Sequence, residues 1–168
     1  MARAVARTSR AAALPQWIPP QLTQLVDTAP EGDGWLHEIK FDGYRMHARL
    51  DRGAVRLLTR TRLDWTHKYP AIAAALTSIG ATQAYLDGEL CGVRPDGTTS
   101  FSMIQLASDS DNAASLVFFL FDLLYLDGED LRSRPLVERK ERLRTFARER
   151  RAVPALQRPH RRAGPGFL

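Results

Sequence analysis

Three short stretches of the sequence carry side chains that could act together in chemistry. Lys40 lies in HEIKFDGYR, two residues ahead of Asp42 in an Asp-Gly pair. Asp87 and Glu89 lie in LDGEL, and because one residue separates them, both carboxylates point to the same face of a strand. Phe119 and Phe121 share a strand face in FFLFDLLYLDG for the same reason. A lysine, two carboxylates and an aromatic shelf on strands suit a site for a purine nucleotide and a divalent cation.

Each stretch alone has a more common structural explanation. A single exposed lysine is usually solvated, Asp-Gly pairs are above all turn formers, and a Phe-rich strand usually belongs to the core. Carboxylates at alternate positions often mark the wet face of a strand. A functional interpretation therefore depends on the order, the spacing and the flanking sequence of the three stretches together.

Composition is typical of one soluble domain, and charge is divided unevenly along it. The 168 residues are 44% hydrophobic and 26% charged. The longest apolar stretch, SLVFFLFDLLYL, is too short for a membrane span. The single cysteine, Cys91, excludes an internal disulfide and a multi-cysteine metal site. The net charge of +5 comes from the two ends, because residues 14–131 carry nine basic and sixteen acidic residues. A basic tail can bind phosphate backbones without specificity, but the middle is not a basic platform.

The elements that must position these side chains are expected to form an α+β domain. Polar and apolar residues alternate over residues 44–51, and the Asp-Arg-Gly that follows predicts a hairpin turn. The remaining expected strands are 35–40, 54–60, 84–93 (broken at its Asp-Gly) and 115–126, and the expected helices are 66–79, 101–107 and 135–150. In the last helix, Leu136, Leu143 and Ala147 mark the apolar face. Long antiparallel strands with helices between them favour α+β over a βαβ sheet, and no GxGxxG or GxxxxGK[ST] phosphate loop occurs.

Taken in order, these stretches resemble the nucleotidyltransferase motifs of ATP-dependent DNA ligases. The similar segments are EIKFDGYR, LLTRTRLDWTHKYP, LDGEL and FFLFDLLYLDGEDLRSRPLVERKERL, with IPPQL at the domain entry. The sequence is most similar to the ligase domain of the bacterial end-joining ligase D, over about residues 17–146. The resemblance implies a nucleotidyltransferase (ATP-grasp-like) fold of antiparallel sheets with flanking helices, and a cytoplasmic, nucleoid-associated bacterial protein.

The family's chemistry implies a role for the lysine. In such enzymes the motif lysine attacks the α-phosphate of ATP, releases pyrophosphate and carries AMP as a phosphoramidate. AMP then passes to the 5′-phosphate of nicked or broken double-stranded DNA. By resemblance Lys40 is this nucleophile, ATP is the cofactor, and Mg²⁺ or Mn²⁺ accompanies the triphosphate. An amine attacks only when neutral, so its surroundings must lower its pKa.

The resemblance also implies a set of nucleotide-binding side chains. Glu38 would lie near the adenine amino group, and Arg45 and Arg60 would reach ribose, the AMP phosphate or the nick phosphate. Glu89 would contact ribose or help to hold the metal, and Phe121 would stack on adenine. The neighbouring residues would be Asp87, in a structural role, and Phe119, as the alternative stacking residue.

Two departures from the family pattern stand out. The second motif usually continues Arg-Asn-Gly, but this chain has Arg60-Thr61-Arg62, and neither Thr nor Arg adopts positive φ cheaply. After residue 146 there is no EGxxxK-like motif with a metal-binding Glu, no motif of paired lysines and no OB-fold domain. We therefore expect a C-terminally truncated adenylation domain over residues 17–148. It would lie between a basic disordered lead (1–16) and a basic, Pro/Arg-rich disordered tail (149–168).

Three functions fit this pattern. The leading one is the adenylation domain of an ATP-dependent DNA ligase in DNA repair and recombination, with nicked or broken DNA and end-joining proteins as partners and no membrane partner. An RNA ligase or a GTP-using capping enzyme would share the fold. An inactive remnant would bind nucleotide or DNA weakly through its basic tail. Steep salt dependence without ATP dependence would favour the remnant.

Overall fold

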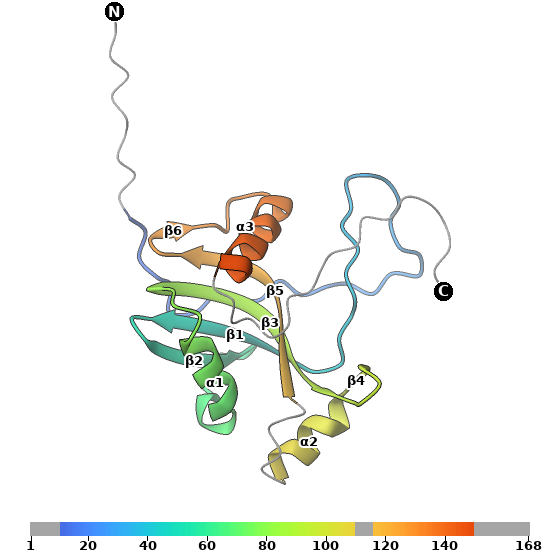
Figure 1. Ribbon diagram of the computed structural model, residues 1–168. Coiled ribbons are helices and arrows are strands. Elements are labelled where there is room, and N and C mark those ends of the chain that lie inside the picture. The colour runs from blue at the N-terminus through green and yellow to red at the C-terminus, as the bar shows by residue number, and fades with distance from the viewer. Residues whose placement is uncertain (1–10, 110–115, 150–168) are drawn as a thin grey trace, which may run out of the picture.

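The computed structural model describes residues 11–109 and 116–149, which form an antiparallel sheet with three α-helices (Figure 1). In chain order the elements are β1 (Tyr44–Asp51), β2 (Ala54–Thr59), the 3-10 helix η1 (Thr66–Lys68), α1 (Pro70–Thr77), β3 (Gln83–Val93), β4 (Thr99–Ser100), α2 (Phe101–Asp109), β5 (Leu116–Leu126), β6 (Glu129–Asp130) and α3 (Leu136–Glu149). The strand order is β2-β1-β3-β5-β6, and β4 pairs with β3. The predicted α+β class with an antiparallel sheet is confirmed.

The β1–β2 hairpin follows the prediction closely. Arg52 and Gly53 are the two loop residues, with φ of 50° and 89°. Positive φ at both central positions is the turn that matches the twist of paired strands. The register then runs from Asp51 opposite Ala54 to Met46 opposite Thr59. The hairpin fixes which face each β1 side chain takes.

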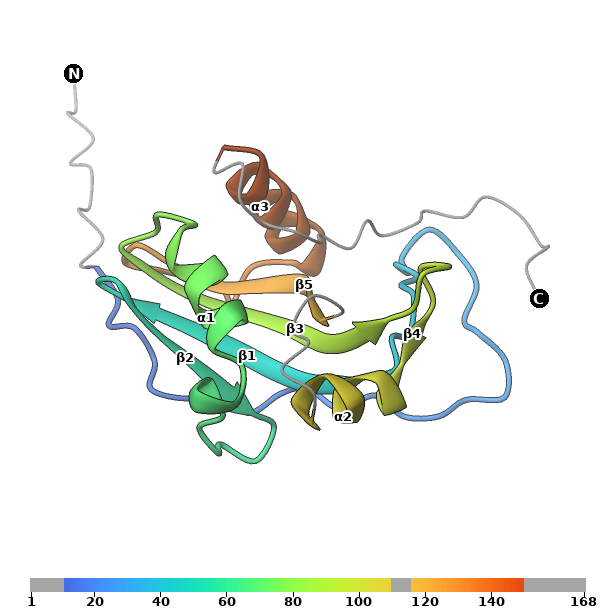
Figure 2. The same cartoon turned by 60° about the horizontal axis from the view of Figure 1, so that its bottom comes forward.

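All three α-helices cover one face of the sheet. The core on this face takes Met46, Ala48 and Leu50 from β1, together with Leu86 and Leu90 from β3. The helices close it with Leu76 of α1, Ile104 of α2, and Leu143 and Phe146 of α3. In Figures 1 and 2, α1 lies over β1 and β2, whereas α3 lies along β5. The alternation read from residues 44–51 therefore assigns the core face correctly.

The other face of the sheet is covered at one end by the N-terminal segment. Leu14 and Ile18 pack with Tyr85 and Tyr125 in a second apolar cluster. The amide of Ala12 donates to the Gly128 carbonyl at 2.7 Å. Residues 11–16, which we expected within a disordered lead, thus lie along the sheet. Residues 1–10 and nearly all of the expected tail (149–168) lie outside the described residues.

Two sequence-based expectations about strands are wrong. Residues 35–40 form no strand and contribute one bridge residue, His37. β3 is not broken at Asp87-Gly88 but runs through it. Gly88 is there because a β-carbon would lie 2.6 Å from the Phe119 carbonyl oxygen on β5. An Asp-Gly pair predicted a turn, and here close strand packing explains its glycine.

The described residues contain no helix that is long and apolar enough to cross a membrane.

Candidate functional site

The segment that carries Lys40 is tied to the sheet by each of the three residues after it. The ring of Phe41 stacks on Phe119 of β5, with 4.1 Å between centroids. Asp42 accepts a hydrogen bond from the Phe101 amide, the first residue of α2, and its own amide donates to Thr99 Oγ1, both at 3.2 Å. A carboxylate at a helix N-terminus is favourable because the first amides there have no helical partner.

Gly43 completes this anchoring. A β-carbon on Gly43 would collide with the Leu90 carbonyl oxygen of β3 and with the Cys91 sulfur. Its φ is not positive, so close approach, and not a turn, accounts for the glycine. Lys40 itself is exposed. Lys40 is thus an exposed lysine on a segment that is otherwise held in place. It lies outside any strand, so the strand expected at residues 35–40 is wrong for Lys40.

Glu89 of β3 lies beside this segment. It accepts a hydrogen bond from the Gly43 amide and faces the charges of Arg45 and Lys40. Burial nevertheless raises the pKa of Glu89 above its ordinary value, and these favourable contacts offset only part of the effect. Glu89 thus interacts electrostatically with Lys40. Their roles toward a ligand stay predictions.

Asp87, two residues earlier on the same face, is fully engaged within the protein. Arg45 Nε donates to its Oδ1 at 2.9 Å and Arg45 Nη2 to its Oδ2 at 2.7 Å. His47 Nε2 lies 3.4 Å from the same Oδ1. Burial alone would raise the pKa of Asp87, but the bonds from His47 and Arg45 outweigh it and hold the pKa below its ordinary value. Asp87 thus bonds to other side chains of the protein, which agrees with the structural role expected for it.

A buried polar chain continues from Asp87 to the N-terminal segment. The Tyr85 hydroxyl lies 3.0 Å from His47 Nδ1 and accepts the Ile18 amide at 3.0 Å. Because Tyr85 accepts one bond, its own proton is available to His47 Nδ1. The chain therefore links the segment at Ile18 to Arg45 through three buried side chains. Sequence reasoning did not include His47 and Tyr85 among the candidate residues. A strand in the middle of a sheet is buried on both faces, and this expectation for the strands at 44–51 and 83–93 could have pointed to them.

The two aromatic candidates have different surroundings. The Phe121 ring has the Arg45 guanidinium 4.8 Å from its centroid and Lys140 Nζ 5.6 Å away. Phe119 has one face covered by Phe41. β5 is irregular here: Asp122 lies opposite Asp87, but Leu120 already lies opposite Gly88. This bulge leaves Phe121 without a direct partner on β3.

Glu38 and Arg60 lie in contrasting positions. Glu38 forms an ion pair with Lys140 of α3, and its side chain is 29% exposed. Arg60 is exposed on the turn after β2, and no hydrogen bond or ion pair joins it to another described residue of the site. In that turn Arg62, not Thr61, has the positive φ, 69°. Arg60 follows Thr59, which lies opposite Met46 on β1. Arg60 is therefore near the end of β1 that carries Arg45.

The residues described here form no ready-made metal cage. Among residues 11–109 and 116–149, no three His, Cys, Asp or Glu side chains gather closely enough to hold an ion. Asp87 is committed to Arg45, whereas Glu89 faces the charge of Lys40 and has no ion pair of this kind with another described residue. This donor set fits Mg²⁺ or Mn²⁺ bound mainly through phosphate oxygens, since Mg²⁺ commonly uses one or two protein carboxylates beside a substrate's phosphates.

Cys91 is a poor candidate for a nucleophile. The thiol is buried and lies near Glu89 and Asp42. Burial, with help from these two carboxylates, raises the pKa of Cys91 to about 12. A thiol that stays protonated at neutral pH is a weak nucleophile.

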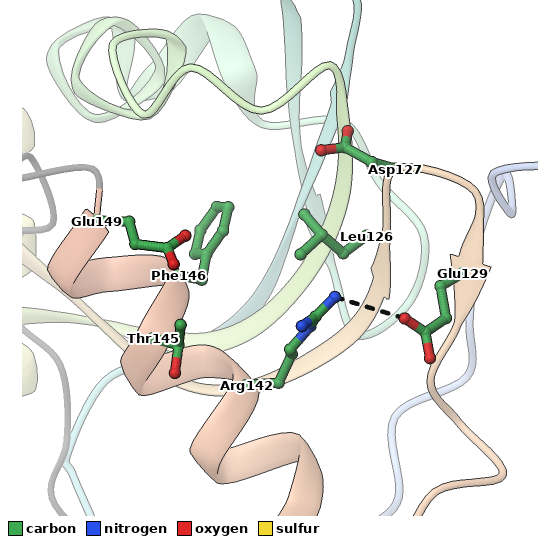
Figure 3. Close-up of a pocket in the computed structure, with 7 residues that line it drawn as sticks. All are labelled: Leu126, Asp127, Glu129, Arg142, Thr145, Phe146 and Glu149. Atoms are coloured by element: carbon green, nitrogen blue, oxygen red, sulfur yellow. Dashed lines mark ion pairs between the residues drawn. The ribbon is translucent and has the colours of Figure 1, made fainter.

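A hollow of about 280 Å³ lies elsewhere on the molecule (Figure 3). It is bounded by the β5–β6 turn and the C-terminal half of α3, with Asp127, Glu129, Arg142 and Phe146 in its lining. Leu126, the β5 residue that borders the hollow, pairs with Ala84 near the start of β3. Tyr44, which follows the Lys40 segment, pairs with Leu90 toward the other end of β3. The hollow is therefore separate from the Lys40 site.

Comparison with known proteins agrees with this geometry. Residues 20–160 match the family model described as "ATP dependent DNA ligase domain". Over 141 residues the chain is 40% identical to the multifunctional non-homologous end joining protein LigD of Pseudomonas aeruginosa, covering 84% of this chain and 17% of that protein. It is 35% identical over 144 residues to a DNA ligase of Pyrobaculum calidifontis, covering 77% of this chain and 25% of that one.

Solved structures lead to the same family. The ligase domain of M. tuberculosis LigD superposes with a TM-score of 0.65 at 34% identity, and a mycobacterial DNA ligase D complexed with ATP and MES with 0.63 at 31%. Each match covers 74% of this chain and 39% of the other. The chain thus spans under half of these ligase structures and about a sixth of the Pseudomonas relative. With the family model matched over most of its length, the chain belongs to the ATP-dependent DNA ligase family, in the adenylation domain and with LigD-type ligase domains among its relatives.

Proposed function

We propose that this chain binds ATP and becomes adenylated on Lys40. The observation that carries the proposal is the fixed segment around Lys40: Phe41, Asp42 and Gly43 are each held by the sheet or by α2, and the lysine between them and Glu38 is exposed beside Glu89. Family membership supports the chemistry. Effective nucleophilic catalysis needs an attacking atom held at a set position, which such anchoring provides.

The step conserves atoms and charge. Lys40 Nζ first loses a proton to solvent and then attacks the α-phosphorus of ATP. A phosphorus–nitrogen bond forms as the bond from the α-phosphorus to the bridging oxygen breaks, and pyrophosphate leaves with that electron pair. Arg45 would offset the negative charge that develops on the phosphate oxygens. Mg²⁺ or Mn²⁺, bound with Glu89 as one ligand, would supply further positive charge to the triphosphate.

The remaining side chains bind and orient the nucleotide in this proposal. Phe121 stacks on the purine, and Glu38 accepts a hydrogen bond from the adenine amino group. Glu89 contacts the ribose or the metal. Arg60 reaches outward to a phosphate, either of the nucleotide or of a DNA nick. Arg45 keeps its bonds to Asp87 and presents the outer edge of its guanidinium.

In the complete ligase the adenylate is transferred to DNA. AMP passes to the 5′-phosphate of a nick or break, and the 3′-hydroxyl then displaces it to seal the strand. We propose end joining as the setting because the Pseudomonas and Mycobacterium relatives are named for non-homologous end joining. This chain would supply the first step of that sequence.

The test is the intact mass of the protein after incubation with ATP and Mg²⁺ or Mn²⁺. One adenylate adduct is expected on the wild-type chain and none on Lys40→Ala, with Lys68→Ala as the matched control because Lys68 is also exposed and its ammonium packs on the Trp65 ring. Acid treatment should release the adduct, as expected of a phosphoramidate. Absence of an adduct on a cooperatively folded wild-type protein, or its persistence in Lys40→Ala, would refute the proposal.

A further inference from the structure

Lys140 occupies an unusual position on α3. The helix turns Leu143 and Phe146 toward the core, and Lys140, three residues before Leu143, lies on the same side with 3% of its side chain exposed. Lysine is almost never buried to this degree without a partner. The apolar face expected from the sequence began at Leu136, which is 38% exposed, so the buried stripe of the helix starts with a charge and not with a leucine.

The Lys140 ammonium joins two parts of the candidate site that lie far apart in sequence. It forms an ion pair with Glu38. It also donates to the main-chain carbonyl of Phe121 at 2.5 Å, where β5 is bulged. Its Nζ lies 5.6 Å from the Phe121 ring centroid. One buried cation thus contacts both the carboxylate and the aromatic residue to which the proposed function gives the purine.

Stability is a poor reason for this arrangement. A buried ion pair loses solvation that its own attraction barely repays, and an apolar residue of similar size often serves a core as well or better. What the pair does supply is position. Glu38 lies on a segment without regular structure, and its side chain is still 29% exposed. Without Lys140 nothing described on α3 would hold that carboxylate beside Phe121.

We propose that Lys140 is a positioning residue that sets the choice of purine. This inference rests on the proposed function, in which Glu38 meets the six-position of the base. By holding Glu38 as an oriented carboxylate, Lys140 makes that position a hydrogen-bond acceptor. Adenine offers a donor there, its amino group, whereas hypoxanthine and guanine offer an acceptor carbonyl that a carboxylate repels. A site built around a polar group of the ligand rejects the analogue that lacks it.

The test compares binding of ATP and inosine triphosphate, which differ at the six-position of the base. The full 168-residue chain is titrated with each nucleotide by calorimetry. Wild type is expected to prefer ATP about tenfold or more, the usual scale for a hydrogen bond to a charged group. Lys140→Met keeps the length and loses the charge. Lys140→Gln also loses the charge but keeps a donor for the Phe121 carbonyl. Both are expected to bring the preference to within about twofold.

Two further variants sharpen the comparison. Lys140→Arg restores a cation and should restore most of the ATP preference. Arg142→Met is the matched control, since Arg142 is an exposed cation of the same helix, paired with Glu129. It should leave the preference unchanged. Melting curves recorded beside the titrations report whether each variant is folded.

The outcomes separate the inference from the proposed function. If wild type binds neither nucleotide, the proposed function falls and this inference with it. If wild type prefers ATP and the folded Lys140→Met or Lys140→Gln protein prefers it equally, the proposed function stands and the positioning role of Lys140 is refuted. Unfolding of both uncharged variants would also refute it, because Lys140 would then serve the fold itself.

Discussion

Arg45 and Asp87 hold each other across β1 and β3 by two parallel hydrogen bonds of 2.9 and 2.7 Å. The side chain of Asp87 is 6% exposed and that of Arg45 is 27% exposed, so the pair runs from the interior to the surface beside Phe121. An Arg–carboxylate fork of this kind fixes orientation as well as charge. The fork therefore fixes the orientation of Arg45, as its proposed role of offsetting charge on phosphate oxygens requires.

Asp87→Asn is expected to destabilise the protein strongly. The amide has one oxygen where the carboxylate has two, and it leaves the partly buried Arg45 charge without its counter-ion. Removing one partner of a buried pair costs about 3–5 kcal/mol of unfolding free energy. Urea unfolding followed by circular dichroism measures the change.

Asp130→Asn is the matched control for that variant. Asp130 also binds an arginine through a fork, Arg132, but both side chains are largely solvated, at 32% and 49% exposure. Exposed pairs contribute about 0–1 kcal/mol. Equal losses in Asp87→Asn and Asp130→Asn would show that burial of the Arg45–Asp87 pair does not matter to stability.

Tyr85→Phe is expected to loosen the N-terminal segment. The hydroxyl accepts the Ile18 amide and contacts His47 Nδ1, and Tyr85 is fully buried. Its removal leaves both groups without a partner away from water, at a cost of about 1–3 kcal/mol. Hydrogen exchange at the Ile18 amide should speed up. Tyr44→Phe, at a half-buried tyrosine, should leave that exchange rate unchanged; protection of Ile18 that survives Tyr85→Phe would contradict the chain of bonds.

Local pattern was enough to predict much of the fold. The hairpin at Arg52-Gly53 and the two faces of residues 44–51 follow from turn chemistry and from period-two alternation, and both are confirmed. The strand expected at 35–40 is wrong because its backbone pairing depends on neighbours far away in sequence. The break expected at Asp87-Gly88 is wrong because a glycine can serve close packing as well as a turn. An Asp-Gly pair in a sequence does not show whether its glycine serves a turn or close packing between strands.

The site was predictable in part for a similar reason. The structure shows an electrostatic interaction between Lys40 and Glu89, and their roles toward a ligand stay predictions. The partners of the other residues come from tertiary structure: Arg45 from its register opposite β3, and Glu38 from α3, about a hundred residues later in the chain. The sequence around Lys140 is highly charged and predicts an exposed lysine on the surface of the helix. Only the three-dimensional position of α3 against β5 reveals it as buried.

Arg62→Gly is expected to stabilise the turn after β2. Arg62 has φ of 69°, which costs a non-glycine residue about 1–2 kcal/mol, whereas glycine adopts it freely and loses about 0.5–1 kcal/mol through its more flexible unfolded chain. A net gain of about 0.5 kcal/mol follows. Arg60→Gly, in the same turn without positive φ, should lose stability instead. Paired urea titrations measure both changes, and a loss in Arg62→Gly equal to that in Arg60→Gly would contradict the argument.

Glu89→Gln is expected to gain stability at neutral pH and to lose function. Burial raises the pKa of Glu89, so the folded protein holds this proton more tightly than the unfolded chain does. The resulting stabilisation is present below the ordinary pKa of 4.5 and is lost as pH rises through the raised value, so the ionised carboxylate costs stability at pH 7. Glutamine carries no such cost. Melting temperatures from pH 4 to pH 8 should therefore show Glu89→Gln above wild type at pH 7, with the gap closing toward pH 4. Glu31→Gln, at an exposed loop residue, is the matched control. The adenylate adduct should form on wild type and on Glu31→Gln but not on Glu89→Gln. A loss of function together with a gain in stability is expected where a protein keeps a destabilising residue for its function. A Glu89→Gln protein that melts below wild type at pH 7 would contradict this account.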